Sequence, residues 1–150
     1  MNLFTGEESD EYFGSDTPPA VRRLLEQAAS APREQVGSIL WTAQATAPDC
    51  LSVYYLLYKY HAGRRQFDMA ERAAIKGLER AAALAGLPTD WREAKGPAEG
   101  GINFANVPGN SPERFWIFTL KALTFISVRS GRVDDAKAIY KEIDRKLSEQ

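Results

Sequence analysis

The sequence predicts an all-α protein built from three antiparallel helical hairpins, with a long loop between the second and third hairpins. Apolar residues recur at helical spacing in six segments, proline or glycine separates these segments, and no segment shows a convincing strand pattern. Most connections are very short, so consecutive helices are expected to pack antiparallel. The 150 residues suffice for one globular domain that needs no disulfide or structural metal.

The first four helices are each bounded by recognisable signals. Asp16 or Thr17 can cap the first helix, and Asp49 can cap the third. Proline or glycine ends all four helices. The expected ranges are 18–31, 34–47, 50–62 and 67–85.

Residues 86–112 behave differently, because they hold five glycines and four prolines and show no periodicity beyond a possible short turn at 90–94. Long loops of this kind are usually functional or disordered. Trp91 and Phe104 are costly to leave in water, so they are expected to dock, either as a lid over a groove or as structural packing. Two helices follow, over 112–129 with Ser111 as cap and over 133–147.

Charge divides the chain unevenly. The net charge is −1, but residues 1–20 hold five acidic side chains and no lysine or arginine, which leaves the rest at a net +4. We therefore expect an acidic flexible arm over 1–17 and a single helical domain over 18–150. The arm is either a solvated tail or a docking segment anchored by Phe4, Tyr12 or Phe13.

Composition argues against several classes of protein. The near-neutral charge does not favour nucleic acid as a partner. The longest apolar-rich stretch, 115–128, is shorter than the roughly 20 residues that span a bilayer, and the acidic N-terminus does not resemble a secretory signal. A single cysteine excludes an intrachain disulfide. We expect a cytoplasmic protein with neither a membrane nor a nucleic acid as partner.

Enzyme signatures are scarce. Cys50 and His61 are the only thiol and imidazole, and on one helix they would lie about 16 Å apart, too far for a nucleophile and its base. The glycine-rich segment 96–101 lacks the lysine and hydroxyl residue of a phosphate-binding loop. The sequence therefore predicts no catalytic residue, no metal and no cofactor.

Two of the hairpins resemble tetratricopeptide repeats. Segment 131–143 has the turn glycine Gly131, the small Ala136 and then Tyr140 and Ile143, in the pattern of that family's second helix. Residues 63–81 show a similar pattern of turn, small and aromatic residues, and residues 34–48 look like the second helix of a third unit. The resemblance implies hairpins stacked in a right-handed array; a compact irregular bundle is the alternative.

Three candidate binding surfaces follow. In the repeat pattern the first helix of each hairpin lines a concave groove, which implies that Tyr55, Lys59, Lys121 and Phe125 share one surface. The second is the basic stripe Arg72, Lys76 and Arg80, spaced four apart on one helix face, and the third includes Trp91 in the loop. For the first surface, the alternative is that these residues cover the rim of the core. For the second, the alternative is an ordinary solvated helix face.

The third expected helix carries four tyrosines, Tyr54, Tyr55, Tyr58 and Tyr60. They cannot all face one side of a helix, so at least one is expected at the surface.

The predicted function is a non-catalytic protein-interaction module, an adaptor or an accessory or assembly factor of a larger complex. Its partner would be another protein or a peptide segment, and a segment with acidic residues would complement the basic stripe. A homodimer is the other alternative. The alternative is a small-molecule or cofactor binder, or a degenerate enzyme, with a pocket between the 86–112 loop and the aromatic helices.

Overall fold

The structure, a computed structural model, describes residues 17–148, and this part of the chain contains six α-helices and no strand. The predicted all-α class is therefore confirmed. The acidic arm, apart from Thr17, and the possible cap Asp16 lie outside the described residues. The helices are α2 (Pro19–Ser30), α3 (Arg33–Thr46), α4 (Leu51–Gly63), α5 (Phe67–Ala85), α6 (Pro112–Arg129) and α7 (Val133–Leu147).

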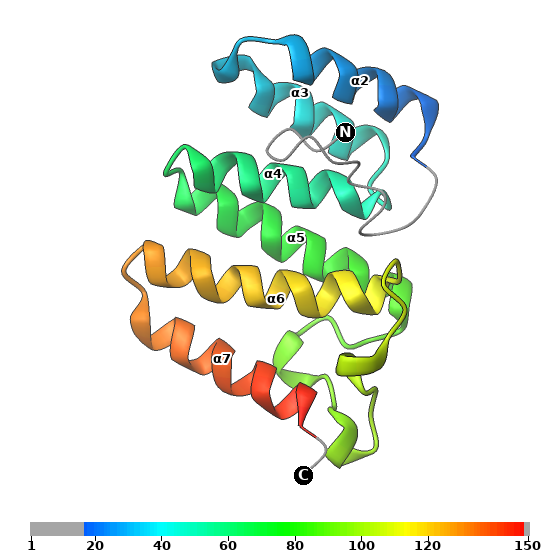
Figure 1. The fold of residues 1–150 in the computed structure, drawn as a ribbon, viewed down its shortest axis with the longest axis vertical. Coiled ribbons are helices and arrows are strands. Elements are labelled where there is room, and N and C mark those ends of the chain that lie inside the picture. The colour runs from blue at the N-terminus through cyan, green and yellow to red at the C-terminus, as the bar shows by residue number, and fades with distance from the viewer. Residues whose placement is uncertain (1–16, 149–150) are drawn as a thin grey trace.

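The helices form three antiparallel hairpins, α2–α3, α4–α5 and α6–α7, stacked one after another along the long axis (Figure 1). Each helix packs mainly on its neighbours in the chain, and α5 lies against both α4 and α6. The helix α4 also packs on α3, so the first helix of one hairpin covers the second helix of the hairpin before it. Within residues 17–148, no helix combines the length and apolarity that a membrane crossing requires.

Local sequence signals explain where the helices begin and end. The Ser111 hydroxyl accepts a hydrogen bond from the Arg114 amide at 3.2 Å, which caps α6 as predicted. Gly86 ends α5 with a φ of 71°, a left-handed conformation that glycine adopts without strain. The caps expected for the first and third helices differ: Pro18 and Cys50 hold the N-cap positions of α2 and α4. Asp49 instead forms an ion pair with Arg80 of α5.

The helix α4 is surrounded by its neighbours, and all four of its tyrosines are buried. The expectation that at least one lies at the surface was wrong, because α3, α5 and α6 cover different sides of this helix. Hydrogen bonds to the tyrosine hydroxyl groups offset the free-energy cost of burying them. The Tyr54 hydroxyl donates to the Pro48 carbonyl oxygen at 2.7 Å, and the Tyr60 hydroxyl donates to that of Arg33 at 2.5 Å.

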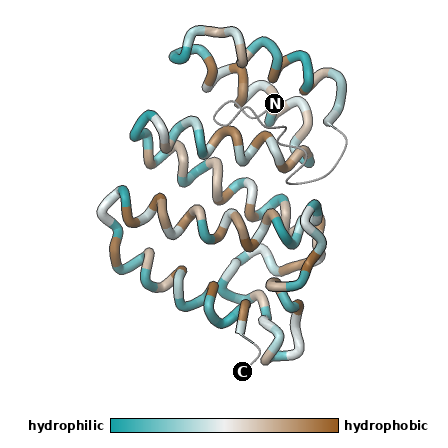
Figure 2. Tube along the Cα trace, viewed as in Figure 1, coloured by the Kyte–Doolittle hydropathy of each residue, from teal (hydrophilic) through white to brown (hydrophobic). Residues whose placement is uncertain are grey.

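Small residues let α5 approach its neighbours closely. A Cβ atom at Gly77 would lie 3.0 Å from the Cβ of Tyr54 and 3.1 Å from the ring of Phe115. Figure 2 shows the strongly hydrophobic positions concentrated along α4 and α6, on either side of α5 in the stack. The alanine-rich pattern of α5 thus serves close packing as well as helix propensity. The other small buried residues of α5 are Ala70, Ala73, Ala74, Ala81 and Ala82.

The loop between α5 and α6 is a packed structural element. It contains three short 3₁₀ turns, η1 (Trp91–Glu93), η2 (Pro97–Glu99) and η3 (Phe104–Asn106). Phe104 is fully buried, and its ring stacks on that of Trp116 with centroids 4.9 Å apart and an interplanar angle of 25°. Of the alternatives that the sequence left open, the fold therefore supports docking of the loop and not disorder.

Candidate functional site

A groove of about 440 Å³ runs between α4 and α6. Residues three and four apart on each helix point into it, because this spacing places side chains on one helix face. The groove is bordered by Tyr55, Tyr58, Lys59, Ala62 and Gly63 from α4, and by Phe118, Ala122, Phe125, Ile126 and Arg129 from α6.

The floor of the groove is aromatic and held in place. Tyr55 packs edge-on against Tyr58, with ring centroids 5.6 Å apart and an interplanar angle of 84°, and it also contacts Phe118 at 5.9 Å. The Tyr58 hydroxyl lies 3.3 Å from the Thr119 hydroxyl, and burial raises the pKa of this tyrosine far above its ordinary value. Phe125 at the rim keeps 56% of its surface exposed. The site therefore offers rigid buried rings below and one accessible ring above.

Within residues 17–148, the charged side chains that line the groove are all cationic. The Lys59 ammonium lies 5.8 Å from the centre of the Tyr55 ring, and the Arg129 guanidinium lies 5.7 Å from that of Phe125. No aspartate or glutamate is among the ten lining residues that belong to the described part of the chain. This combination suits a ligand that presents an apolar side chain beside a carboxylate.

Three of the four groove residues expected from the sequence line this groove, namely Tyr55, Lys59 and Phe125. Lys121 instead lines a separate depression between α6 and α7, together with Tyr140 and Asp144. The reason is the angle around α6: positions 118, 122, 125 and 129 face α4, whereas positions 121, 124 and 128 turn towards α7. The sequence interpretation did not include Phe118 or Arg129, although both follow from Phe125 by helical spacing.

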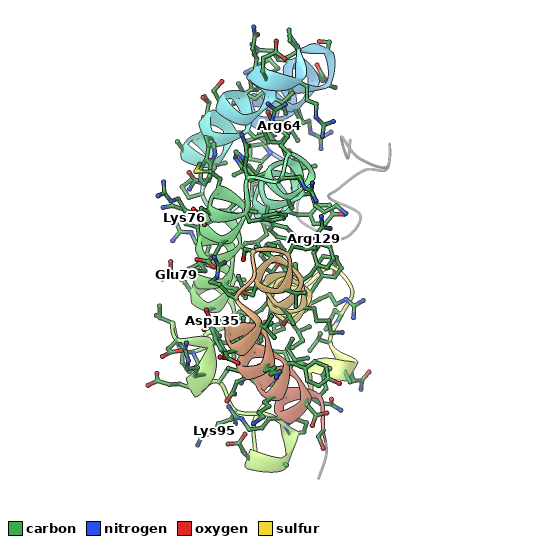
Figure 3. All side chains as sticks on the ribbon, turned by 90° about the vertical axis from the view of Figure 1, so that its left-hand side faces the viewer. Arg64, Lys76, Glu79, Lys95, Arg129 and Asp135 are labelled. Carbon is green, nitrogen blue, oxygen red and sulfur yellow. The ribbon has the colours of Figure 1, made fainter. Side chains whose placement is uncertain are left out.

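The basic stripe of α5 is not part of the groove. Figure 3 shows Lys76 on the opposite side of the stack from Arg129, with Glu79 on the same side as Lys76. Arg80 forms an ion pair with Asp49 at 2.5 Å. Arg72 and Lys76 are exposed, but acidic neighbours offset the charge at the C-terminal end of the stripe.

Trp91 also lies away from the groove. It is partly buried against the core, and the Arg92 guanidinium lies 4.3 Å from the centre of its ring. The loop packs against α6 and α7, and none of its residues lines the α4–α6 groove. The interpretation of the loop as a lid over this groove was therefore wrong. The Phe104 and Trp116 rings stack where the alternative pocket was expected.

The residues that sequence analysis weighed for chemistry have structural partners. His61 lies between Trp41 and Gln66, at hydrogen-bond distances of 3.1 and 2.8 Å. Cys50 is buried, with its sulfur 3.5 Å from the Ser52 hydroxyl. Among residues 17–148, no group of three or more histidine, cysteine, aspartate or glutamate side chains is placed to hold a metal ion.

Fold and groove together define an all-α protein of stacked helical hairpins with an aromatic, cationic groove between two first helices. The chain belongs to the family of the uncharacterized 19.8 kDa protein in the nifW 5′ region of Azotobacter chroococcum mcd 1. The two proteins are 30% identical over 142 residues, which cover 93% of this chain and 76% of the relative. No protein-family description matches the chain. No solved structure matches it either.

Proposed function

We propose that this protein is a non-catalytic, tetratricopeptide-like interaction module that acts as an accessory or assembly factor. In this proposal the α4–α6 groove binds a segment of another protein in which an aromatic or aliphatic residue adjoins aspartate or glutamate. The observation that carries the proposal is the pairing of an aromatic floor with Lys59 and Arg129, with no acidic residue among the lining residues of the described range 17–148.

The chemistry of the groove explains the choice of ligand. Aromatic residues and arginine are enriched at protein interfaces. Aromatic rings bury large areas at a small cost in conformational entropy, and arginine adds a charge with several hydrogen-bond donors. Phe125 is the accessible ring, so an apolar side chain of the partner would pack against it. Lys59 on α4 and Arg129 on α6 would then attract carboxylates on either side, which favours acidic over basic segments.

Two further observations support the wider role. The first helices of successive hairpins line the groove, as the tetratricopeptide resemblance implies. The name of the relative places it in the 5′ region of nifW. We extend that gene context to this chain, and propose that it assists proteins that act together with the nifW product.

Selection of ligands from a displayed library of random peptides of about 12 residues tests the proposal. We expect the enriched peptides to combine acidic with aromatic or aliphatic residues. The variant Phe125→Ala/Arg129→Glu should weaken their binding at least about tenfold, which corresponds to roughly 1.4 kcal/mol. The matched control is Leu84→Ala/Lys95→Glu, which makes similar changes at exposed positions away from the groove and should bind normally.

Two results would contradict the proposal. One is a set of enriched peptides that bind the groove variant and the wild type equally well. The other is binding that survives in the groove variant but is lost in Lys76→Glu, which would move the site to the α5 stripe.

A further inference from the structure

The outer side of the third hairpin carries an apolar surface on which no other helix of the described part of the chain packs. Val128, Val133 and Tyr140 keep 51%, 50% and 65% of their surfaces exposed. Two depressions of about 370 Å³ each lie along this surface between α6 and α7, and Tyr140 borders both. We call this the α6–α7 face.

The corresponding surfaces of the other two hairpins are covered by helices. The helix α4 packs on α3 of the first hairpin, and α6 packs on α5 and α4 of the second. The α6–α7 face continues this series, so its shape suits a further helix. The 86–112 loop does not fill it, because the loop contacts Arg145 and Lys146, which lie on other sides of α7.

The charges along α7 indicate which helix fits. Lys137 and Asp144 are both exposed and lie on either side of Tyr140, two helical turns or about 10.5 Å apart. If a second α7 is laid antiparallel, with a two-fold axis beside Tyr140, each Lys137 faces an Asp144 of the other copy. A two-fold contact of this kind pairs one surface with itself.

We propose that the α6–α7 face is a dimer interface, in which α7 packs antiparallel on α7 of a second copy of this chain. Tyr140 then lies near the two-fold axis, and Val133 at each end of the contact loses its exposure to water. Two ion pairs between Lys137 and Asp144 set the register. This surface is distinct from the α4–α6 groove, so the dimer and the proposed peptide binding can succeed or fail separately.

Sedimentation equilibrium of the full chain and of charge-reversed variants tests the proposal. We expect the dimer to have a dissociation constant in the micromolar range, as is typical of small interfaces. The wild type should therefore be dimeric at a protein concentration of about 100 μM. Lys137→Asp places two carboxylates opposite each other, and Asp144→Lys places two ammonium groups opposite each other. Each variant alone should therefore be monomeric. Lys76→Asp, the same charge change on α5, should remain dimeric.

Mixing the two charge-reversed variants gives the sharpest result. In the mixed pair, the new carboxylate at position 137 of one chain faces the new ammonium group at position 144 of the other. The unchanged Lys137 and Asp144 face each other at the second contact, so both ion pairs are restored and a heterodimer should form. All substituted side chains are exposed, and circular dichroism should show unchanged helix. A monomeric wild type, single variants that stay dimeric, or a mixture that stays monomeric would each overturn the proposal.

Discussion

The hydrogen bonds of His61 determine which of its two ring nitrogens carries the proton. The Trp41 Nε1 can only donate, so the His61 Nε2 that lies 3.1 Å away must accept. The proton therefore sits on Nδ1, which donates to the Gln66 side-chain oxygen at 2.8 Å. Burial lowers the pKa of His61; the Gln66 hydrogen bond partly opposes this, and the nearby Arg64 charge adds to it.

This arrangement predicts that acidification destabilises the fold. The unfolded chain takes up a proton at His61 near pH 6.5, whereas the folded chain does so only at lower pH. The stabilisation is complete above about pH 6.5 and is lost as the pH falls from there towards the lower folded-state pKa. We expect the free energy of unfolding in urea to be smaller at pH 5.5 than at pH 7.5.

The variant His61→Gln provides the control for this prediction. Glutamine can accept from Trp41 and donate to Gln66, but it does not titrate, and His61 is the one histidine in the sequence. The loss of stability between pH 7.5 and 5.5 should therefore be clearly smaller in the variant. Equal losses in both proteins would show that His61 is not the titrating group.

Lys146 is a second buried titratable residue, and it is paired with a carboxylate. Its side chain is fully buried, its ammonium group donates to Glu142 at 2.8 Å, and it lies 5.9 Å from the centre of the Trp116 ring. Burial lowers the pKa of Lys146, while the Glu142 carboxylate opposes that shift. Burial alone would raise the pKa of Glu142, but hydrogen bonds from Lys146 and Arg145 outweigh it and hold that pKa below its ordinary value. The hydrogen bond between Lys146 and Glu142 thus satisfies the buried ammonium group.

At the scale of elements, the loop is fastened to α7 by backbone contact and by one arginine. Arg145 pairs with Glu99 and donates to the carbonyl oxygens of Arg92 and Ala94 at 2.9 and 3.1 Å. Gly96 lies so close to α7 that an added Cβ would be 2.4 Å from the Arg145 carbonyl oxygen. Glycine is required there because the two backbones meet directly.

Gly96→Ala should therefore detach the loop from α7. Overpacking of this kind costs about 1–3 kcal/mol, and here much of the cost falls on the loop. We expect faster trypsin cleavage after Arg92 and Lys95, together with a lower free energy of unfolding in urea. The control is Gly109→Ala, because no atom lies within 4 Å of a Cβ added at that glycine. Similar cleavage rates in the two variants would show that the Gly96 contact does not hold the loop.

The elements also show what local sequence can predict. The ranges 67–85, 112–129 and 133–147 agree with α5, α6 and α7 because periodicity, proline, glycine and the Ser111 cap act within a few residues. The docking of the loop does not follow from such signals. Glu99 and Arg145 are 46 residues apart, and turns of three residues have no periodicity to detect.

At the scale of the whole molecule, the packing of the hairpins on one another determines which of the predicted residues share a surface. The pairing of Tyr55, Lys59 and Phe125 could be predicted, because it needs only the helix faces and the order of the hairpins. The position of Lys121 could not, since it depends on how far α6 is rotated between α4 and α7. The burial of all four α4 tyrosines likewise depends on three neighbouring helices at once.

A stacked array also predicts uneven local stability. The helix α2 packs mainly on α3, whereas α5 lies between α4 and α6. In such arrays stability comes from each unit and its contacts with its neighbours, so an end unit can open while the rest stays folded. We therefore expect hydrogen–deuterium exchange, followed by mass spectrometry, to be faster for the amides of α2 than for those of α5.

One hydrogen bond allows this prediction to be tested selectively. The Tyr60 hydroxyl of α4 donates to the Arg33 carbonyl oxygen at the start of α3 and so ties the first hairpin to the second. Tyr60→Phe leaves this carbonyl without its partner, at a cost of about 1 kcal/mol, which corresponds to roughly fivefold faster exchange. The acceleration should be confined to α2 and α3, because the contacts of α5, α6 and α7 are unchanged. Tyr140→Phe, which removes a hydroxyl from the exposed ring on α7, should leave exchange in α2 and α3 as it is. If Tyr60→Phe instead accelerates all six helices equally, the hairpins open together and the array behaves as one cooperative unit.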